Sequence, residues 1–250
     1  MGVSNKINWL TTWMSLGLLK KVLAFRIKGQ QNKIWAQTPE KKHINIYNRV
    51  DFILKYCKDK KVVHIGCTDF PFTKAKLENN SLLHQFLQKV TEKITGLDND
   101  KNSIEEYIKL TGAKDVYYGD IMQFYPQVVT GTGYDVILLS EVLEHLINPA
   151  KALEVLHEHF SNGTKILVTV PNYVSLSSLA ASLNKTESIH PDHYWYFSPY
   201  TLCKLFNKEK FQLEQLHFGM YYQRDTKINA VMKNFLFNAD CIIAVFSIKK

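Results

Sequence analysis

A chain of 250 residues with 46% hydrophobic residues is long and apolar enough to bury a core, which excludes a disordered chain. The formal net charge of +8 at pH 7 favours anionic partners such as phosphates, nucleotide-linked substrates, acidic glycans or a membrane surface. An ordinary lysine-rich surface explains that charge equally well. The four scattered cysteines form no Cys-x-x-Cys pair, which argues against a zinc knuckle or disulfide framework and predicts a cytoplasmic setting.

The first part of the chain is predicted to be a helical extension with a polar link. Residues 9–25 form the longest apolar run, but Lys20 and Lys21 interrupt it, so it is neither a membrane span nor a good signal peptide. Tryptophans at one end and lysines at the other favour an amphipathic helix, lying at the inner membrane face or docked on a partner. Packing on the chain's own domain fits equally well. We expect residues 1–45 to form this extension and residues 46–250 to form one domain.

From residue 46 onward, short β-rich runs alternate with runs of helical apolar spacing. Strands are predicted at residues 61–66, 94–98, 115–118, 134–139, 164–170, 211–219 and 241–248, and helices at 46–58, 82–93, 101–111 and 149–160. Strands that alternate with helices form right-handed βαβ units around a parallel sheet. No helical pattern separates the last two strands. The sequence therefore predicts an α/β fold, a Rossmann-like mixed seven-stranded sheet with helices on both faces and an antiparallel C-terminal hairpin.

Residues suited to a nucleoside follow the ends of four predicted strands, where ligands bind in open α/β sheets. Gly66 follows the first strand and allows a ligand to approach the backbone closely. Asp98 ends the second strand and can accept hydrogen bonds from both hydroxyls of a ribose. Asp120 and the apolar Ile121 follow the third strand and suit an adenine, which offers an amine donor and an apolar face. Ser140 follows the fourth strand.

The loop after the first strand lacks the G-x-G-x-x-G turn that a dinucleotide pyrophosphate needs, which argues against a dehydrogenase. The four strand-end motifs, in this order, resemble class I S-adenosylmethionine (SAM)-dependent methyltransferases over residues 46–250. The resemblance implies SAM as the cofactor. The cofactor-binding residues that it implies are Gly66, Thr68, Asp69, Asp98, Asn99, Asp120, Ile121 and Ser140.

The loop after Gly66 departs from the family pattern, which usually holds two or three glycines. Thr68 and Asp69 stand where small residues are expected. We therefore expect Asp69 to bind the ammonium group of the cofactor, directly or through water. Residues 74–81 make a long connection to the next helix, and we expect this segment to form a lid.

Glutamates and histidines gather at two places where a methyl acceptor is expected. Residues 141–146 read Glu-Val-Leu-Glu-His-Leu, and on a helical turn Glu141, Glu144 and His145 share one face. His193 ends a His-Pro-Asp-His run after the fifth strand, on a loop expected to cover the site.

The order E-x-x-E-H with a downstream D-H resembles the ubiquinone-pathway O-methyltransferases and the small-RNA terminal 2′-O-methyltransferases. In both branches, two glutamates and two histidines hold a divalent metal that grips the acceptor hydroxyls. The resemblance implies that Glu141, Glu144, His145 and His193 bind magnesium or manganese. Metal-free relatives carry the same turn, and without a metal His193 or His145 is the natural general base.

The region after the fifth strand also resembles methyltransferases found with cell-surface polysaccharide genes. The shared features are Pro171-Asn172, the run from His190 to His193, the aromatics that follow it, and Ser198-Pro199. This resemblance implies O-methylation of a sugar or phosphate-linked group of a capsular or lipopolysaccharide glycan or its precursor. A nitrogen acceptor stays open.

Two alternative functions follow from other features. The basic charge and the E-x-x-E-H turn suggest an RNA 2′-O-methyltransferase, but the lysines are dispersed and no RNA-binding motif is appended, so nucleic acid is not the expected partner. The glycine-poor loop suggests a non-catalytic partner subunit that keeps the fold, whereas the intact Asp98 and Asp120 argue against it.

Overall fold

The computed structural model describes residues 44–123, 133–221 and 239–250. The predicted amphipathic helix at residues 9–25 and most of the polar link lie outside these ranges. No helix in the described part of the chain is long and apolar enough to cross a bilayer.

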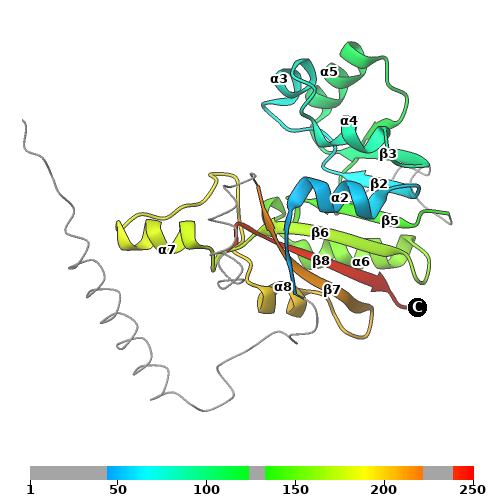
Figure 1. The fold of residues 1–250 in the computed structure, drawn as a ribbon. Coiled ribbons are helices and arrows are strands. Elements are labelled where there is room, and N and C mark those ends of the chain that lie inside the picture. The colour runs from blue at the N-terminus through cyan, green and yellow to red at the C-terminus, as the bar shows by residue number, and fades with distance from the viewer. Residues whose placement is uncertain (1–43, 124–132, 222–238) are drawn as a thin grey trace, which may run out of the picture. The chain divides into compact units, whose positions relative to one another are not determined.

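One mixed sheet organises the described residues (Figure 1). Its strands are β1 (Ile46–Asn48), β2 (Lys61–Ile65), β3 (Lys93–Asp98), β4 (Val116–Tyr118), β5 (Val136–Ser140), β6 (Lys165–Pro171), β7 (Phe211–Met220) and β8 (Cys241–Ile248). They lie in the order β1-β7-β8-β6-β5-β2-β3-β4. β8 runs antiparallel to β6 and β7, and the other neighbouring pairs are parallel. The predicted Rossmann-like α/β fold with its antiparallel C-terminal pair is confirmed.

The sheet has eight strands in the described residues, because the predicted first helix begins later than residue 46. Asn48 ends β1, and its side chain accepts a hydrogen bond from the Asp51 backbone N–H at 3.1 Å. This N-cap starts α2 at Arg49. Residues 46–48 instead pair in parallel with β7, which covers an edge that would otherwise be open.

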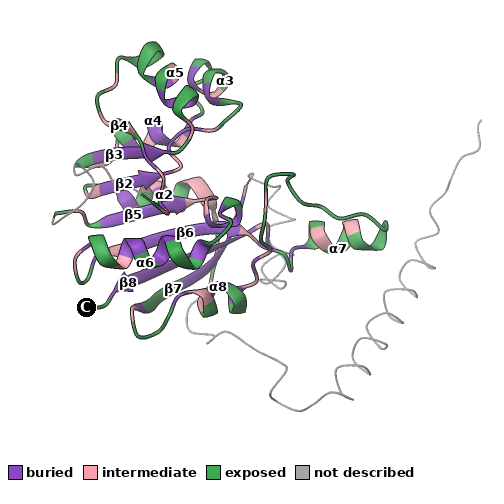
Figure 2. Cartoon of the chain, turned by 180° about the vertical axis from the view of Figure 1, so that it is seen from behind, coloured by how far each residue is buried: buried purple, intermediate pink, exposed green. Residues whose placement is uncertain are grey.

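Helices pack on both faces of the sheet, as predicted. The helices of the described residues are α2 (Arg49–Cys57), α3 (Thr73–Glu78), α4 (Leu83–Gln88), α5 (Lys101–Thr111), the 3₁₀ helix η1 (Leu143–His145), α6 (Pro149–His159), α7 (Leu176–Leu183) and α8 (Pro199–Leu205). α7 is the exception to this packing, because it has no buried residue. α2 lies in front of the sheet in Figure 1, and α6 lies on the opposite face, toward the viewer in Figure 2.

One helix prediction is wrong, and one helix lies in a segment that was predicted as a loop. The helix predicted at residues 82–93 is the shorter α4, because β3 already begins at Lys93. The segment expected to form a lid loop contains α3, whose end is closed by a hydrogen bond from the Ser81 backbone N–H to the Lys76 carbonyl at 2.8 Å. The first predicted helix begins three residues too early, and the other predicted strands and helices agree with the structure to within two residues at each end.

Neighbouring residues of the central strands bury their side chains on opposite faces, as the strand period of two requires. Val62 of β2 packs with the core under α2 and α4, and Val63 packs with the core under α6 and α8. Leu138 and Leu139 of β5 divide in the same way, and all four residues are fully buried (Figure 2). Each side chain of this kind stabilises the fold by about 1.5–3 kcal/mol.

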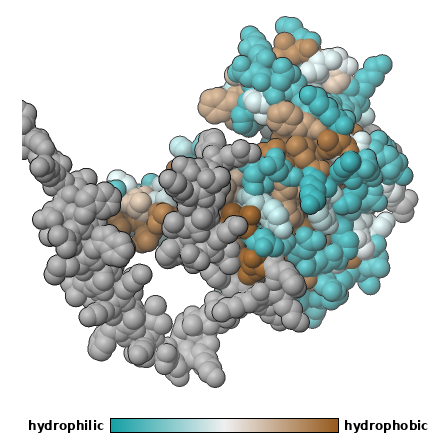
Figure 3. Space-filling model, viewed as in Figure 1, coloured by the Kyte–Doolittle hydropathy of each residue, from teal (hydrophilic) through white to brown (hydrophobic). Residues whose placement is uncertain are grey.

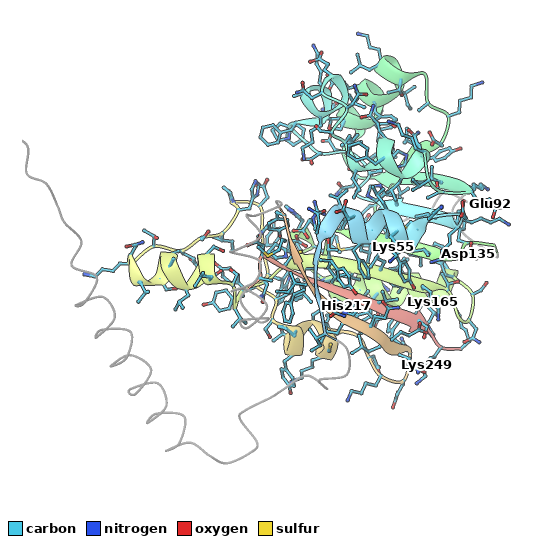
Figure 4. The ribbon with its side chains drawn as sticks, in the orientation of Figure 1. Lys55, Glu92, Asp135, Lys165, His217 and Lys249 are labelled. Carbon is cyan, nitrogen blue, oxygen red and sulfur yellow. The ribbon has the colours of Figure 1, made fainter. Side chains whose placement is uncertain are left out.

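The strand order reverses at β2, which lies between β3 and β5. The connections after β2 and β5 therefore run in opposite directions and leave a crevice at the carboxyl ends of the strands, where ligands bind in such sheets. Figure 4 shows Glu92 and Asp135 at the other end of these strands, where β3 and β5 begin.

Candidate functional site

A cavity of about 650 Å³, the strand-end cavity, lies at the carboxyl ends of β2, β3 and β5. Most of the predicted cofactor-binding residues line it: Gly66, Thr68, Asp69, Asp98, Asn99, Ile121 and Ser140. Asp120 is not among the lining residues, although its neighbours Gly119 and Ile121 are. The Asp120 carboxylate accepts a hydrogen bond from the Met122 backbone N–H at 2.8 Å and so shapes the turn that presents Ile121.

Gly66 is required by its surroundings. Its φ angle is +74°, in the left-handed region, and a Cβ atom there would lie 2.7 Å from Cγ2 of Val142. An L-residue at this position would be strained both by its backbone and by the contact. The glycine thus brings the loop after β2 close to the loop after β5.

Asp98 is buried and fixed by the loop after Gly66. Its Oδ2 accepts hydrogen bonds from the Thr68 N–H at 2.9 Å and the Thr68 hydroxyl at 2.7 Å. Its Oδ1 accepts one from the Asp100 N–H at 3.0 Å. Since a carboxylate has about four acceptor positions, one position on Oδ1 remains for a ligand hydroxyl.

Asp69 has a partner that the sequence reasoning missed. Its carboxylate forms an ion pair with Lys76 of α3, and its backbone N–H donates to the Thr73 hydroxyl at 3.1 Å. Lys76 also lines the strand-end cavity. The sequence does not indicate this pair, because the segment that contains Lys76 has the pattern of a loop. Contact between Asp69 and the cofactor's ammonium group stays a prediction.

Arg49, the first residue of α2, was also missed. Its Nη1 donates to the Ser140 hydroxyl at 2.5 Å, and the Ser140 and Thr169 hydroxyl oxygens lie 3.2 Å apart. The Thr169 hydroxyl donates to Oε1 of Glu141 at 2.8 Å. Arginine only donates and a carboxylate only accepts. The bonds therefore all point one way, from Arg49 through Ser140 and Thr169 to Glu141.

The predicted helical face that joins Glu141 with Glu144 and His145 is wrong. Glu141 has a φ angle of +58°, and the 3₁₀ helix spans Leu143–His145 only. This left-handed backbone is strained for a residue with a side chain. The Glu141 N–H donates to the Thr169 carbonyl at 2.9 Å. Its Oε2 accepts from the Tyr221 hydroxyl at 2.7 Å, so its side chain points toward Thr169 and Tyr221.

Three of the four predicted metal ligands come together. Single donor atoms of Glu144, His145 and His193 all lie within 4.8 Å of one another. The Glu144 side chain is 0% exposed, and neither carboxylate oxygen has a hydrogen-bond partner among the described residues. Burial, with the Glu141 charge in second place, raises the pKa of Glu144 well above its usual value. A buried carboxylate without partners is costly, so the raised pKa favours the neutral carboxyl form of Glu144.

The histidines at this group favour their neutral forms. The His145 and His193 ring centroids lie 4.5 Å apart with the rings nearly perpendicular. Burial, followed by the neighbouring His145 and His190, lowers the pKa of His193 to about 4. Burial also lowers the pKa of His145. His190, which the sequence reasoning did not select, lies 5.3 Å from the His193 ring. A neutral imidazole has a free nitrogen lone pair that can accept a hydrogen bond or bind a metal.

The loop that carries His193 is held against η1 by two hydrogen bonds. The Tyr194 N–H donates to the Glu144 carbonyl at 2.8 Å, and the Trp195 indole N–H donates to the Leu146 carbonyl at 2.7 Å. Ser198 and Thr201 then form a capping box that starts α8, as the Ser-Pro sequence predicted. The loop therefore covers the Glu144 group from a fixed position.

A second cavity of about 640 Å³, the aromatic cavity, adjoins this loop. Its walls combine aromatic side chains with serines and carboxylates: Tyr173, Trp195, Tyr196 and Tyr221, then Ser175, Ser177, Ser178 and Ser188, then Glu141, Glu187 and Asp240. Glu141, His190 and His193 line both cavities. These shared side chains would therefore separate a ligand in one cavity from a ligand in the other.

Comparisons with known proteins agree with this geometry. The model of a family described as "Methyltransferase domain" matches residues 51–216. The chain is similar in structure to the SAM-dependent methyltransferase from Mesorhizobium loti, with a TM-score of 0.52, 12% identity, and coverage of 79% of this chain and 95% of that chain. It is also similar to the TehB-like SAM-dependent methyltransferase from Corynebacterium glutamicum, with a TM-score of 0.51, 14% identity, and coverage of 80% and 86%. No curated protein matches the chain in sequence. Because the family model spans more than half of the chain and the fold agrees, this chain belongs to the methyltransferase-domain family and is a class I SAM-dependent methyltransferase.

Proposed function

We propose that the protein methylates a hydroxyl group of a sugar in a surface glycan or its precursor. The observation that carries the proposal is the shared wall between the two cavities, made by Glu141, His190 and His193. The strand-end cavity suits SAM in size, in the open approach at Gly66 and in the acceptor position left on Asp98. The aromatic cavity then receives the methyl acceptor.

The lining of the aromatic cavity supports a sugar. Tyrosine and tryptophan faces pack against the apolar faces of a ring, and serine hydroxyls and carboxylates bond to its hydroxyls. Glu141, Glu187 and Asp240 line the cavity, and no lysine or arginine does so among the described residues. Carboxylates repel phosphates. We infer that the ring entering this cavity is uncharged or carries an amine, which also disfavours RNA as the acceptor.

Bound SAM supplies an electrophilic methyl group for in-line displacement. The residues of the chain then have two tasks, which are to align the acceptor oxygen and to take its proton. Positioning of this kind supplies much of the acceleration in bimolecular transfers. His193 and His145, neutral at physiological pH, are placed to accept the proton.

A divalent metal fits the same place. Glu144, His145 and His193 offer one carboxylate and two imidazoles, a donor set that suits manganese better than magnesium. The unpartnered Glu144 carboxylate supports this proposal, and Glu141, held by Thr169 and Tyr221, stands beside the group. A metal there would act as a Lewis acid that makes the acceptor hydroxyl more nucleophilic.

The test uses the full chain with labelled SAM, separate pools of surface-glycan precursors and RNA, and a chelator. We expect label to enter the glycan pool and chelator to abolish the transfer, with manganese restoring it. His193→Ala and Glu144→Gln should each reduce the rate by roughly 10²- to 10⁴-fold while S-adenosylhomocysteine binding is retained. His157→Ala, a histidine on α6 that lines neither cavity, is the matched control.

Each other outcome contradicts a named part of the proposal. Transfer that resists the chelator removes the metal and leaves the histidine base. Label in the RNA pool alone removes the glycan. Full activity of both His193→Ala and Glu144→Gln means that the acceptor does not bind at this group.

A further inference from the structure

α7 carries its apolar residues on the outside of the fold. Its three leucines, Leu176, Leu179 and Leu183, are spaced i, i+3 and i+7 and therefore share one side of the helix, the leucine face. They are 49%, 48% and 64% exposed, and Figure 3 shows hydrophobic side chains at α7. A surface helix normally turns such a stripe toward the core. The leucine face thus has no cover among the described residues.

The other side of α7 faces the aromatic cavity. Ser177 and Ser178 line that cavity, and a rotation of about 100° per residue places them roughly opposite the leucines. Ser175, the N-cap of the helix, also lines the cavity, and its hydroxyl accepts a hydrogen bond from the Ser178 N–H at 3.2 Å. α7 therefore lies between the aromatic cavity and whatever covers the leucine face.

The surroundings of the leucine face suit a lipid surface. Residues 173–184 contain no charged residue, and Lys185 follows them. The exposed Tyr173 and Trp195 line the same cavity as the serines of α7. Tyrosine and tryptophan are enriched at the interface between a bilayer and water, because their rings are apolar with one polar group.

The positive charge of the chain lies mostly in one segment of the sequence. Residues 1–43 contain eight Lys and Arg residues and one Glu. They therefore account for nearly all of the formal net charge of +8. The same segment contains the apolar run at residues 9–25. A basic segment is attracted to anionic lipids, and a basic segment together with an apolar contact holds a protein on a bilayer more firmly than either alone.

The size of the leucine face also favours a bilayer over a second copy of the chain. An eight-residue helix is about 12 Å long, whereas a stable interface between two chains buries about 800 Å² on each partner. Three half-exposed leucines provide far less area. We propose that the leucine face of α7 inserts into the interface of a bilayer that contains anionic lipids.

This contact places the aromatic cavity beside the bilayer, which suits an acceptor glycan carried on a lipid. That consequence rests on the proposed function, whereas the binding of the bilayer does not.

The test measures sedimentation of the full chain with vesicles made of equal parts of phosphatidylcholine and phosphatidylglycerol. The variant combines Leu176→Gln, Leu179→Gln and Leu183→Gln, because glutamine keeps a good helix propensity. We expect its affinity for the vesicles to fall at least about 10-fold, since three leucines no longer lose contact with water on binding. The matched control combines Ile108→Gln and Leu110→Gln, two exposed apolar residues of α5, and should bind as the intact chain does. Both variants should keep the intact chain's affinity for S-adenosylhomocysteine.

Three results would overturn the proposal. The first is an unchanged vesicle affinity in the α7 variant, because contacts with one bilayer reinforce each other and the loss of one must show. The second is equal affinity of the intact chain for vesicles of phosphatidylcholine alone. The third is self-association without vesicles, measured by analytical ultracentrifugation and lost in the α7 variant, which would assign the leucine face to a second copy.

If the α7 variant loses S-adenosylhomocysteine binding, Leu183→Gln alone is compared with Ile108→Gln. Leu183 is the most exposed of the three leucines, so its replacement should lower the vesicle affinity without disturbing the fold, and equal affinities of the two variants contradict the proposal. No acceptor takes part in these measurements. Their failure is therefore distinct from a failure of the proposed function, which the labelling of glycan and RNA pools decides.

Discussion

Thr68 occupies a position where the loop of class I methyltransferases usually holds a small residue, and its side chain makes a contact that glycine cannot make. Its hydroxyl and its N–H both donate to Oδ2 of Asp98. Two donors on one oxygen fix the carboxylate plane, and Oδ1 then faces the ligand in a set direction. Thr68, in the place of the usual small residue, thus fixes the orientation of the Asp98 carboxylate.

Asp98→Ala should weaken S-adenosylhomocysteine binding by about 1.5–3 kcal/mol, the scale of charge-assisted hydrogen bonds at a buried site. The measurement is calorimetry. Glu105→Gln, an exposed residue of α5 paired with Lys101, serves as the control and should leave the affinity unchanged. If Asp98→Ala binds as tightly as the intact chain, Asp98 does not contact the cofactor.

Residues whose role depends on local sequence could be predicted, and residues that act through the fold could not. Gly66 and Asp98 follow strands, and parallel strands bring their carboxyl ends together. Arg49 and Lys76 come from α2 and α3, and nothing in the local sequence shows that these helices bring the two side chains to the strand-end cavity. The predicted helical face is wrong at Glu141 because the backbone of this residue is left-handed. That conformation depends on contacts with Thr169 and Tyr221.

At the scale of elements, the strongly apolar strands were predicted well because their side chains are buried on both faces. Short elements were not. β1 has three residues, too few for a pattern, and it exists because β7 offers a free edge. α7 has no buried residue. Its three leucines, Leu176, Leu179 and Leu183, share one face of the helix, but all three are exposed.

At the same scale, the capping box at the start of α8 should contribute measurably to the stability of the protein. Ser198 accepts from the Thr201 N–H at 3.2 Å, and the Thr201 hydroxyl accepts from the Ser198 N–H at 2.8 Å. Ser198→Ala removes one half of this capping box and should cost about 0.5–2 kcal/mol of unfolding free energy. Urea denaturation measures it. Ser182→Ala, an exposed serine within α7, should change stability by less than about 0.5 kcal/mol. Equal losses of stability in Ser198→Ala and Ser182→Ala would show that the capping box does not stabilise the protein.

At the scale of the whole molecule, the overall charge is a poor guide to the ligand. The chain carries a formal net charge of +8, yet Glu141, Glu187 and Asp240 face the aromatic cavity. Figure 3 shows hydrophilic side chains over much of the face around α2 and hydrophobic ones on α7, whose Leu176, Leu179 and Leu183 are exposed. The net charge and composition of a sequence give only the sum over regions that differ in this way. Only the fold decides which charges face a ligand.

The stability of the whole domain should depend on pH through a buried histidine pair. The Nδ1 atoms of His64 and His84 lie 3.1 Å apart, Asp115 lies 3.7 Å from His84, and both histidines are almost fully buried. Burial, then the neighbouring His84 and Arg49, lowers the pKa of His64 well below its usual 6.5. The unfolded chain therefore binds a proton below about pH 6.5 that the folded chain does not.

This difference sets the sign of the effect. Stabilisation by neutral His64 is fully present above about pH 6.5 and is lost as the pH falls below that value, by at most about 1.4 kcal/mol per pH unit. His64→Gln keeps a hydrogen-bonding group beside His84 but cannot titrate. Urea denaturation at several values between about pH 5 and pH 8 should give a shallower decline toward acid for His64→Gln than for the intact chain. Parallel curves for the two proteins would mean that His64 takes up its proton without unfolding, and that the buried pair does not limit stability in acid.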